Sequence, residues 1–367
     1  MRRPFTSLVV AAPFLLSACG DPPTAASAKR SAPIAGPLPF TVVASGLNNP
    51  RGITFGRDGA IYVAEAGVPD GHAVTTVGQC LQVPPPIGPV AGGHTGRISR
   101  IAGGVRTTVV DGLPSSRTAV GEVIGVTDLA FVGQTLYALL NGGCSRSLPG
   151  EPASVVRVED GGYSMVANLS AWIQANPAAQ PGADFEPDGD WYAMIAAGGV
   201  LYLTEANQGN LVTVKPQAGH VERVVDISAD QGHVVPTALT EHRGDILVGE
   251  LTPFLLEPGA AEVLRYRRNG TLEAELGGFT MILGLAADQK GNVYVMESTV
   301  CPTAAPCFPT PGTGRIVRIA PDGSRATIAT GLSLATSMRL GPDGALYVSN
   351  WGFGDPGTGE ILRYELP

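Results

Sequence analysis

The stretch Pro50-Arg-Gly-Ile-Thr-Phe-Gly-Arg-Asp-Gly-Ala-Ile-Tyr-Val-Ala-Glu65 decides the fold. It contains a short apolar strand, a turn through Asp58-Gly59, and a second strand that carries Tyr62. Glycine and aspartate supply the backbone conformations that tight hairpin turns need. The segment therefore predicts a β-hairpin.

The same pattern of strand, turn and strand recurs along the chain. Further copies lie at residues 126–140, 192–205, 237–250, 283–297 and 337–350. A second hairpin follows each copy, so each unit has four antiparallel strands, and units of this length are typical of β-propeller blades. Parallel-sheet enzymes would need helices between the strands, whereas these connections are rich in glycine and proline. One helix-like piece, residues 169–175, interrupts the pattern.

The two ends of the repeat region predict how the ring closes. The sixth unit ends at Gly359-Glu-Ile-Leu-Arg-Tyr364 and lacks a fourth strand. Residues 40–47 resemble the fourth strands at residues 106–113 and 325–332. We therefore predict an all-β protein, a six-bladed propeller over residues 40–367. In it, residues 40–47 form the outer strand of the last blade and remove an open sheet edge.

The composition excludes several classes of protein. The chain of 367 residues has only 15% charged residues, against a usual value of about 25%, which argues against long charged helices and coiled coils. The net charge is −8 and aromatic residues make up 6%. Because a nucleic-acid-binding protein needs a basic face, no nucleic-acid partner is expected.

The N-terminus predicts export. Arg2 and Arg3 precede an apolar run, residues 7–16, which is too short to span a bilayer and is followed by small residues. Leu16-Ser-Ala-Cys19 resembles the bacterial lipobox, whose cysteine is diacylated and becomes the mature N-terminus. Plain secretion, with cleavage after residues 26–28, is the alternative.

This resemblance predicts the organisation of the N-terminal region. Residues 1–18 would be a lipoprotein signal peptide, and residues 19–39, rich in proline, glycine, alanine and serine, a flexible tether. Two acyl chains at Cys19 would hold the protein on a bacterial membrane, on the periplasmic or cell-surface side.

Four cysteines remain besides Cys19, namely Cys80, Cys144, Cys301 and Cys307. An even number in an exported chain predicts two disulfides. Cys301 and Cys307 are close in sequence and are expected to staple one loop, which leaves Cys80 to pair with Cys144. The alternative is a metal site, which would lack a Cys-x-x-Cys pair.

Long insertions fall between the second and third strands, at residues 66–95, 141–153 and 298–313. In a propeller these loops share one face with the entries to the first strands, and they contain all four remaining cysteines. Long ordered loops on a rigid scaffold are where function concentrates. Arg51 and Asp128 lie at first-strand entries on this face, where they could form a structural pair or bind an anionic ligand.

Acidic residues end several of the second strands. This set consists of Glu65, Glu205, Glu250 and Glu297, with Asn350 at the equivalent place in the last blade and Leu140 interrupting the set. Directed at the channel mouth, four carboxylates could bind a hard cation such as calcium. Alternatively, each acid could accept hydrogen bonds from the next loop and lock its own blade.

A second candidate calcium site is the segment from Asp184 through Glu186 to Asp188, in which acids alternate before a glycine. The segment contains Pro187 and lacks a glutamate at the twelfth position. A capping or turn role is therefore the alternative.

Residues 46–67 resemble the opening repeat of the ScyD/ScyE family, which is named for a cyanobacterial scytonemin gene cluster and is related to NHL-type propellers. Residues 168–177 and 187–192 resemble a second family segment, although Pro-Asp-Gly-Asp-Trp-Tyr stands where the family has Asp-Ser-Asn-Pro-Tyr-Gly. The resemblance covers residues 40–367 and implies an exported six-bladed propeller without implying a reaction. The architecture also resembles gluconolactonase and paraoxonase-type propellers, which implies calcium in the central channel.

Motifs of several enzyme classes are missing from the sequence, including Gly-x-Ser-x-Gly, His-Glu-x-x-His and the phosphate loop. No catalytic residue is therefore assigned. The predicted function is a lipid-anchored envelope propeller that binds a small molecule or an envelope protein. The alternatives are a calcium-dependent lactonase-like hydrolase and a structural component of a surface assembly.

Overall fold

The computed structural model describes residues 36–367 except 69–73, 76, 254 and 302–306. Residues 36–367 form one compact unit. The predicted signal peptide, Cys19 and almost all of the predicted tether lie outside the described residues. None of the helices that the structure describes has the length and apolar character needed to cross a membrane.

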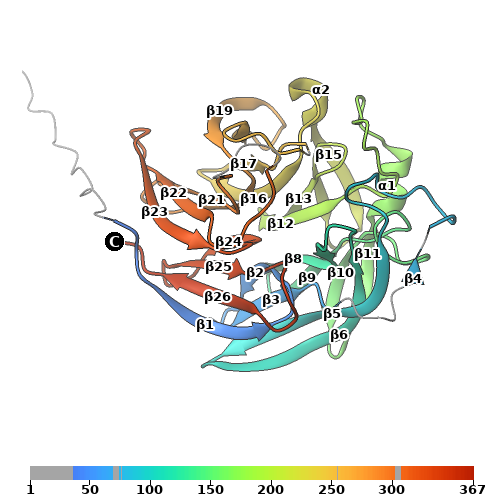
Figure 1. Ribbon diagram of the computed structural model, residues 1–367, viewed down its shortest axis with the longest axis horizontal. Helices are drawn as coiled ribbons and strands as arrows, with labels where there is room; N and C mark the ends of the chain where they lie inside the picture. The colour runs from blue at the N-terminus through green and yellow to red at the C-terminus, as the bar shows by residue number, and fades with distance from the viewer. Residues whose placement is uncertain (1–35, 69–73, 76, 254, 302–306) are drawn as a thin grey trace, which may run out of the picture. The chain divides into compact units, whose positions relative to one another are not determined.

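Six antiparallel sheets follow one another around a ring as the blades of a propeller (Figure 1), which confirms the predicted fold class. Their innermost strands contact one another in chain order, and β24 contacts β2, which closes the ring.

Each blade contains four main strands in a simple up-and-down order. Blade 1 has β2 (Pro50–Phe55), β3 (Ile61–Glu65), β5 (Ala91–Ala102) and β6 (Val105–Arg117). Blade 2 has β8 (Val126–Val132), β9 (Thr135–Leu140), β10 (Ser154–Glu159) and β11 (Gly162–Asn168). Blade 3 has β12 (Trp191–Ala197), β13 (Val200–Glu205), β14 (Asn210–Lys215) and β15 (His220–Asp226).

The second half of the ring repeats this order. Blade 4 has β16 (Pro236–His242), β17 (Asp245–Glu250), β18 (Ala261–Tyr266) and β19 (Leu272–Phe279). Blade 5 has β20 (Ile282–Ala287), β21 (Val293–Glu297), β22 (Gly314–Ile319) and β23 (Arg325–Leu332). Blade 6 has β24 (Ser337–Leu340), β25 (Leu346–Asn350), β26 (Gly359–Tyr364) and β1 (Phe40–Leu47).

Four short elements depart from the regular blades. The strands β4 (Val74–Thr75) and β7 (Val123–Ile124) extend blade 1. Helix α1 (Leu169–Ala175) lies where the sequence predicts a helix-like piece, and the Asn168 side chain caps it by accepting a hydrogen bond from the Ala171 amide. Helix α2 (Ile227–Gln231) was not predicted and is capped in the same way by Asp226.

In blades 5 and 6 the turn aspartate binds the tyrosine of the blade repeat. In blade 6, Asp343 accepts hydrogen bonds from the Tyr347 hydroxyl at 3.0 Å and from Arg363 Nε at 2.9 Å. In blade 5, Asp288 accepts a hydrogen bond from Tyr294 at 2.9 Å. Asp343 thus ties the first hairpin turn of blade 6 to the third strand, whereas Asp288 holds the tyrosine of its own hairpin.

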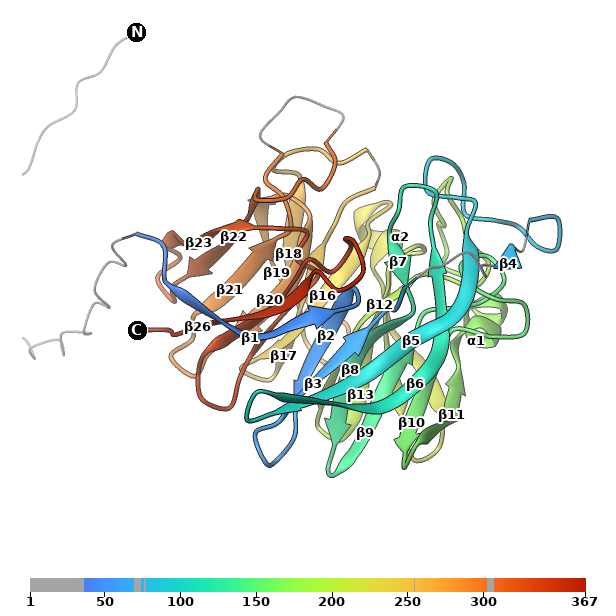
Figure 2. The same cartoon turned by 60° about the horizontal axis from the view of Figure 1, so that its bottom comes forward.

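The ring closes as the sequence predicts. Strand β1 pairs antiparallel with β26 (Figure 2). Phe40 lies opposite Tyr364 in this pairing. Leu47, at the end of β1, is fully buried in a cluster with Ile53 of blade 1 and Ile361 of blade 6. The first strand of the described chain therefore completes the last blade.

Both predicted disulfides are confirmed. Cys80 bonds to Cys144 with Cα atoms 6.0 Å apart, and Cys301 bonds to Cys307 with Cα atoms 5.5 Å apart. The first joins the β3–β5 loop to the β9–β10 loop, and the second closes the β21–β22 loop. At its lower edge Figure 2 shows the β2–β3 and β8–β9 hairpin turns. The β3–β5, β9–β10 and β21–β22 loops follow the second strands and therefore lie at the opposite end of the ring. We call this end the loop face.

Candidate functional site at the channel mouth

A single arginine fills the centre of the ring. Arg339 extends from β24 in blade 6 and donates hydrogen bonds to the Leu239 carbonyl at 3.0 Å and the Met194 carbonyl at 2.8 Å. It also donates to Asp128 Oδ2 at 2.6 Å. The guanidinium thus joins blade 6 to blades 2, 3 and 4. We call the pair Arg339–Asp128 the channel plug.

The plug leaves little free space. The cavity bounded by Asp128, Tyr192 and Arg339 measures about 10 Å³, which is room for about one water molecule. Burial raises the pKa of Asp128, while Arg339 opposes that rise. A Cβ atom on Gly52 would lie 1.9 Å from Asp128 Oδ1, so only glycine fits beside the plug. An organic ligand therefore has no room in this cavity beside the plug.

Arg51 lies at the mouth of the channel on the loop face. Only 2% of it is exposed, and its guanidinium donates to Glu122 at 3.2 Å, to the Tyr192 hydroxyl at 3.2 Å and to the Val123 carbonyl. The rings of Tyr192 and Phe353 lie 5.9 and 5.6 Å from it. Its Nε atom has no hydrogen-bond partner among the described residues. Arg51 and Asp128 therefore do not pair with each other, because each has a different partner.

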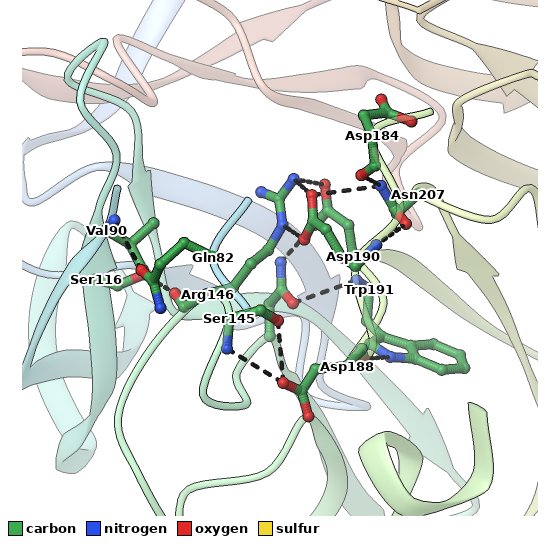
Figure 3. A network of polar contacts seen from close by, with 12 residues as sticks. Gln82, Val90, Ser116, Ser145, Arg146, Asp184, Asp188, Asp190, Trp191 and Asn207 are labelled. Carbon is green, nitrogen blue, oxygen red and sulfur yellow. Dashed lines mark hydrogen bonds and ion pairs between the residues drawn. The ribbon is translucent and has the colours of Figure 1, made fainter. Parts of the chain in front are cut away.

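A second buried arginine, Arg146, shares the field of Asp190 and Glu122 with Arg51. Figure 3 shows Arg146 with Asp190. Arg146, in the loop after β9, makes a two-pronged ion pair with Glu186, with Nη2 at 2.7 Å from Oε1, and its Nη2 lies 3.1 Å from Asp190 Oδ2. Asn141 donates to Asp190 Oδ1 at 2.5 Å. We call Arg51, Glu122, Arg146, Glu186 and Asp190 the mouth cluster.

The carboxylates of the mouth cluster differ in burial and in their access to solvent. Burial raises the pKa of Glu186 to about 8, although Arg146 opposes the shift. Asp190 and Glu122 retain side-chain exposures of 15% and 28%. A group from solvent can therefore reach these two carboxylates, whereas Glu186 is enclosed.

Three of the four strand-end acids are locked within their blades. Glu65 binds Arg97 at 2.9 Å, and Glu297 binds Arg315, whose Nη2 lies 3.2 Å away. Glu205 accepts hydrogen bonds from the Asp190 amide at 3.0 Å and the Asn210 side chain at 2.8 Å, among others. Their carboxylates are fully buried. Each of these three acids therefore accepts hydrogen bonds that hold its own blade together, which is the alternative to calcium binding given above.

The remaining two positions of this set differ. Asn350 accepts a hydrogen bond from the Ser333 amide at 2.8 Å, as a lock without charge. Glu250 is 4% exposed, and burial together with Glu262 and Glu275 raises its pKa to about 8.

The three acids of the segment 184–188 do not converge. Asp184 pairs with His233 at 3.0 Å, Glu186 pairs with Arg146, and Asp188 accepts from the Ser145 hydroxyl at 3.0 Å. Across the described part of the chain, no group of three or more histidine, cysteine, aspartate or glutamate side chains could hold a metal ion. The donors of both candidate sets therefore do not fit a calcium ion.

Sequence reasoning missed Arg339, Arg146 and Asp190. Arg339 had a usable signal, because it is a charged residue within Ser-Met-Arg-Leu, the innermost strand of a blade. Arg146 had none, since nothing in the loop sequence specifies which acid it meets.

No protein-family model and no curated protein matches the sequence. Solved structures match the fold. A protein named glucose dehydrogenase has a TM-score of 0.56 at 14% identity, over 90% of this chain and 100% of that one. Regucalcin from Agrobacterium tumefaciens, a calcium-binding protein, has a TM-score of 0.53 at 13% identity, over 90% and 95% of the two chains. A gluconolactonase from Xanthomonas campestris has a TM-score of 0.52 at 10% identity, over 89% of each chain. The chain is thus similar to these β-propellers in fold.

Proposed function

We propose that the protein is a lipid-anchored envelope propeller that binds a small anionic ligand, or an acidic group of an envelope protein, at the mouth cluster. One observation carries this proposal: the plug closes the channel below the mouth, whereas Arg51 lies above it among stapled loops. A ligand must therefore bind on the loop face. Membership of the ScyD/ScyE family, supported by the repeat at residues 46–67, is part of the same proposal.

The ionic partner of Arg51 indicates how an anion would bind. Glu122 is 28% exposed and meets Arg51 through a single contact of 3.2 Å. A carboxylate or phosphate of a ligand can take its place, and the free Nε of Arg51 offers a further donor. The rings of Tyr192 and Phe353 hold the guanidinium in position for this exchange.

Two substitutions with opposite expected effects test this site. In a thermal-shift series with citrate, gluconate and inorganic phosphate, Glu122→Gln should strengthen binding because it removes the competing carboxylate. Arg51→Met should weaken binding about tenfold or more, since a hydrogen bond to a charged group contributes about 1.5–3 kcal/mol. If these anions shift the melting of the wild type and both variants equally, or shift none of them, the proposed site is wrong.

The hydrolase remains the second candidate because Glu186 and Asp190 share one arginine. Asp190, whose side chain is 15% exposed, is the carboxylate of this pair that a substrate could reach, whereas Glu186 is enclosed. Regucalcin and the gluconolactonase are similar in fold, which alone does not transfer their activities. In an assay of gluconolactone hydrolysis, we expect no turnover and no effect of calcium or chelator on melting. Turnover that is lost in Asp190→Asn would place the hydrolase first.

Membrane attachment at Cys19 is part of the proposal. Leu16-Ser-Ala-Cys19 matches the lipobox, and Gly20 does not supply the aspartate of an inner-membrane retention signal. We expect Cys19→Ala to move the protein from the membrane fraction to the soluble fraction of bacterial cells, because both acyl chains are lost. Cys80→Ala is the control, since it should stay in the membrane fraction. Retention of Cys19→Ala on membranes would contradict lipid attachment.

A further inference from the structure

The third strands of blades 1 and 5 show which group fits the buried strand-end glutamate. Arg97 lies directly opposite Glu65, and Arg315 lies opposite Glu297. Both arginines approach from the surface, with side-chain exposures of 24% and 36%, and each reaches a carboxylate that is fully buried. A guanidinium from outside the blade can therefore reach this position.

Blade 4 lacks that arginine. The register of β17 with β18, in which Gly249 lies opposite Val263, places Glu262 opposite Glu250. An acid thus occupies the place of Arg97 and Arg315. Glu275 lies opposite Leu264 on the next strand and adds a third carboxylate to the same side of the blade. We call Glu250, Glu262 and Glu275 the blade-4 acids.

The polar groups at this place lack partners. Glu250 is 96% buried, and no hydrogen bond or ion pair of the described residues reaches its carboxylate; the charges acting on it belong to Glu262 and Glu275. The Tyr266 hydroxyl is fully buried and also has no hydrogen-bond partner. Tyr266 lies within the field of Glu250, Glu275 and Asp230, which together with burial raises its pKa. Burying such groups without partners is costly, so the site is incomplete as it stands.

We propose that blade 4 binds the guanidinium group of an external ligand between Glu250 and Glu262. The bound group would take the place that Arg97 and Arg315 occupy in their own blades, donating N–H groups to both oxygens of Glu250. Glu262 and Glu275 would supply further acceptors and a negative field. This site is separate from the mouth cluster, and it binds the opposite charge.

Titration calorimetry with agmatine tests the site. We expect saturable binding to the wild type at pH 9, and about tenfold or greater loss in Glu262→Arg, because the new side chain forms the internal pair that blades 1 and 5 already have. Glu250→Gln should lose binding to the same extent while preserving shape. Glu222→Arg is the matched control, because it makes the same charge change at an exposed position of β15 and should leave affinity unchanged.

The pH dependence supplies a second readout. Below a pKa of about 8, Glu250 holds a proton that a cation must displace, so affinity for agmatine should fall about tenfold per pH unit as the pH decreases toward 6.5. Glu262→Arg should also melt higher than the wild type, which shows that it folds. Absence of binding at pH 9, or binding that survives Glu262→Arg, would overturn the proposal.

The source of the guanidinium is distinguished by a second probe. The capped peptide acetyl-Gly-Arg-Gly-amide presents the same group as part of a chain. Tighter binding of this peptide than of agmatine indicates that the guanidinium comes from an arginine side chain of a partner protein. Tighter binding of agmatine indicates that it comes from a small guanidinium compound.

Discussion

We expect Arg339→Met to lower the free energy of unfolding by about 3–5 kcal/mol, the range found when one partner of a buried ion pair is removed. The substitution leaves the Asp128 carboxylate, 4% exposed in its side chain, without its cation. It also removes the hydrogen bonds that the carbonyls of Met194 and Leu239 accept. Urea denaturation followed by tryptophan fluorescence measures the loss.

A double variant and a surface control separate charge from packing. Adding Asp128→Asn to Arg339→Met should restore part of the stability, because the uncompensated charge disappears. Arg57→Met, at an exposed turn position, should change stability by less than about 0.5 kcal/mol. A loss in Arg339→Met no greater than in Arg57→Met would show that the plug does not stabilise the ring.

A chain that begins at Asn48 lacks β1, and it should melt about 10 °C or more below the full protein and aggregate. The reason is that β26 becomes an open edge strand and the core around Leu47 is exposed. Differential scanning calorimetry and light scattering measure the two effects.

A chain that begins at Gly36 is the control for this truncation. It keeps β1 and the hydrogen bond from the Leu38 amide to the Ile328 carbonyl. It should therefore have the same melting temperature as the full protein. Equal melting of the chains that begin at Asn48 and at Gly36 would contradict the role of β1 as the clasp of blade 6.

The sequence predicts the fold well because the propeller repeats a local rule. A tight turn that contains glycine recurs in all six units, and a tyrosine equivalent to Tyr62 recurs in all but the fourth, which has Leu247. Hairpin formation of this kind depends on neighbouring residues. The place of β1 in blade 6 was also predictable, since residues 40–47 share the pattern of other outer strands. The disulfides followed from the number of cysteines and their places in the long loops.

The candidate site was less predictable because it depends on contacts between blades. A strand-end glutamate such as Glu65 does not reveal whether it faces the channel or its own blade. The answer lies in the register with Arg97, and the repeated Gly-Arg-Ile at residues 96–98 and 314–316 was the available signal. Arg146 and Glu186 meet only through loop packing, which no spacing encodes.

The pairing of β1 with β26 also governs the order in which the protein folds. Among the strands of the blades, β1 comes first in the sequence and its partner β26 comes last. Blade 6 therefore cannot form until β26 is available. Contacts of such long sequence separation are slow to form, and closing the ring is therefore expected to be a late step of folding. The same arrangement protects the finished molecule, because β1 and β26 cannot separate without opening blade 6. We therefore expect the first step of unfolding to be slow.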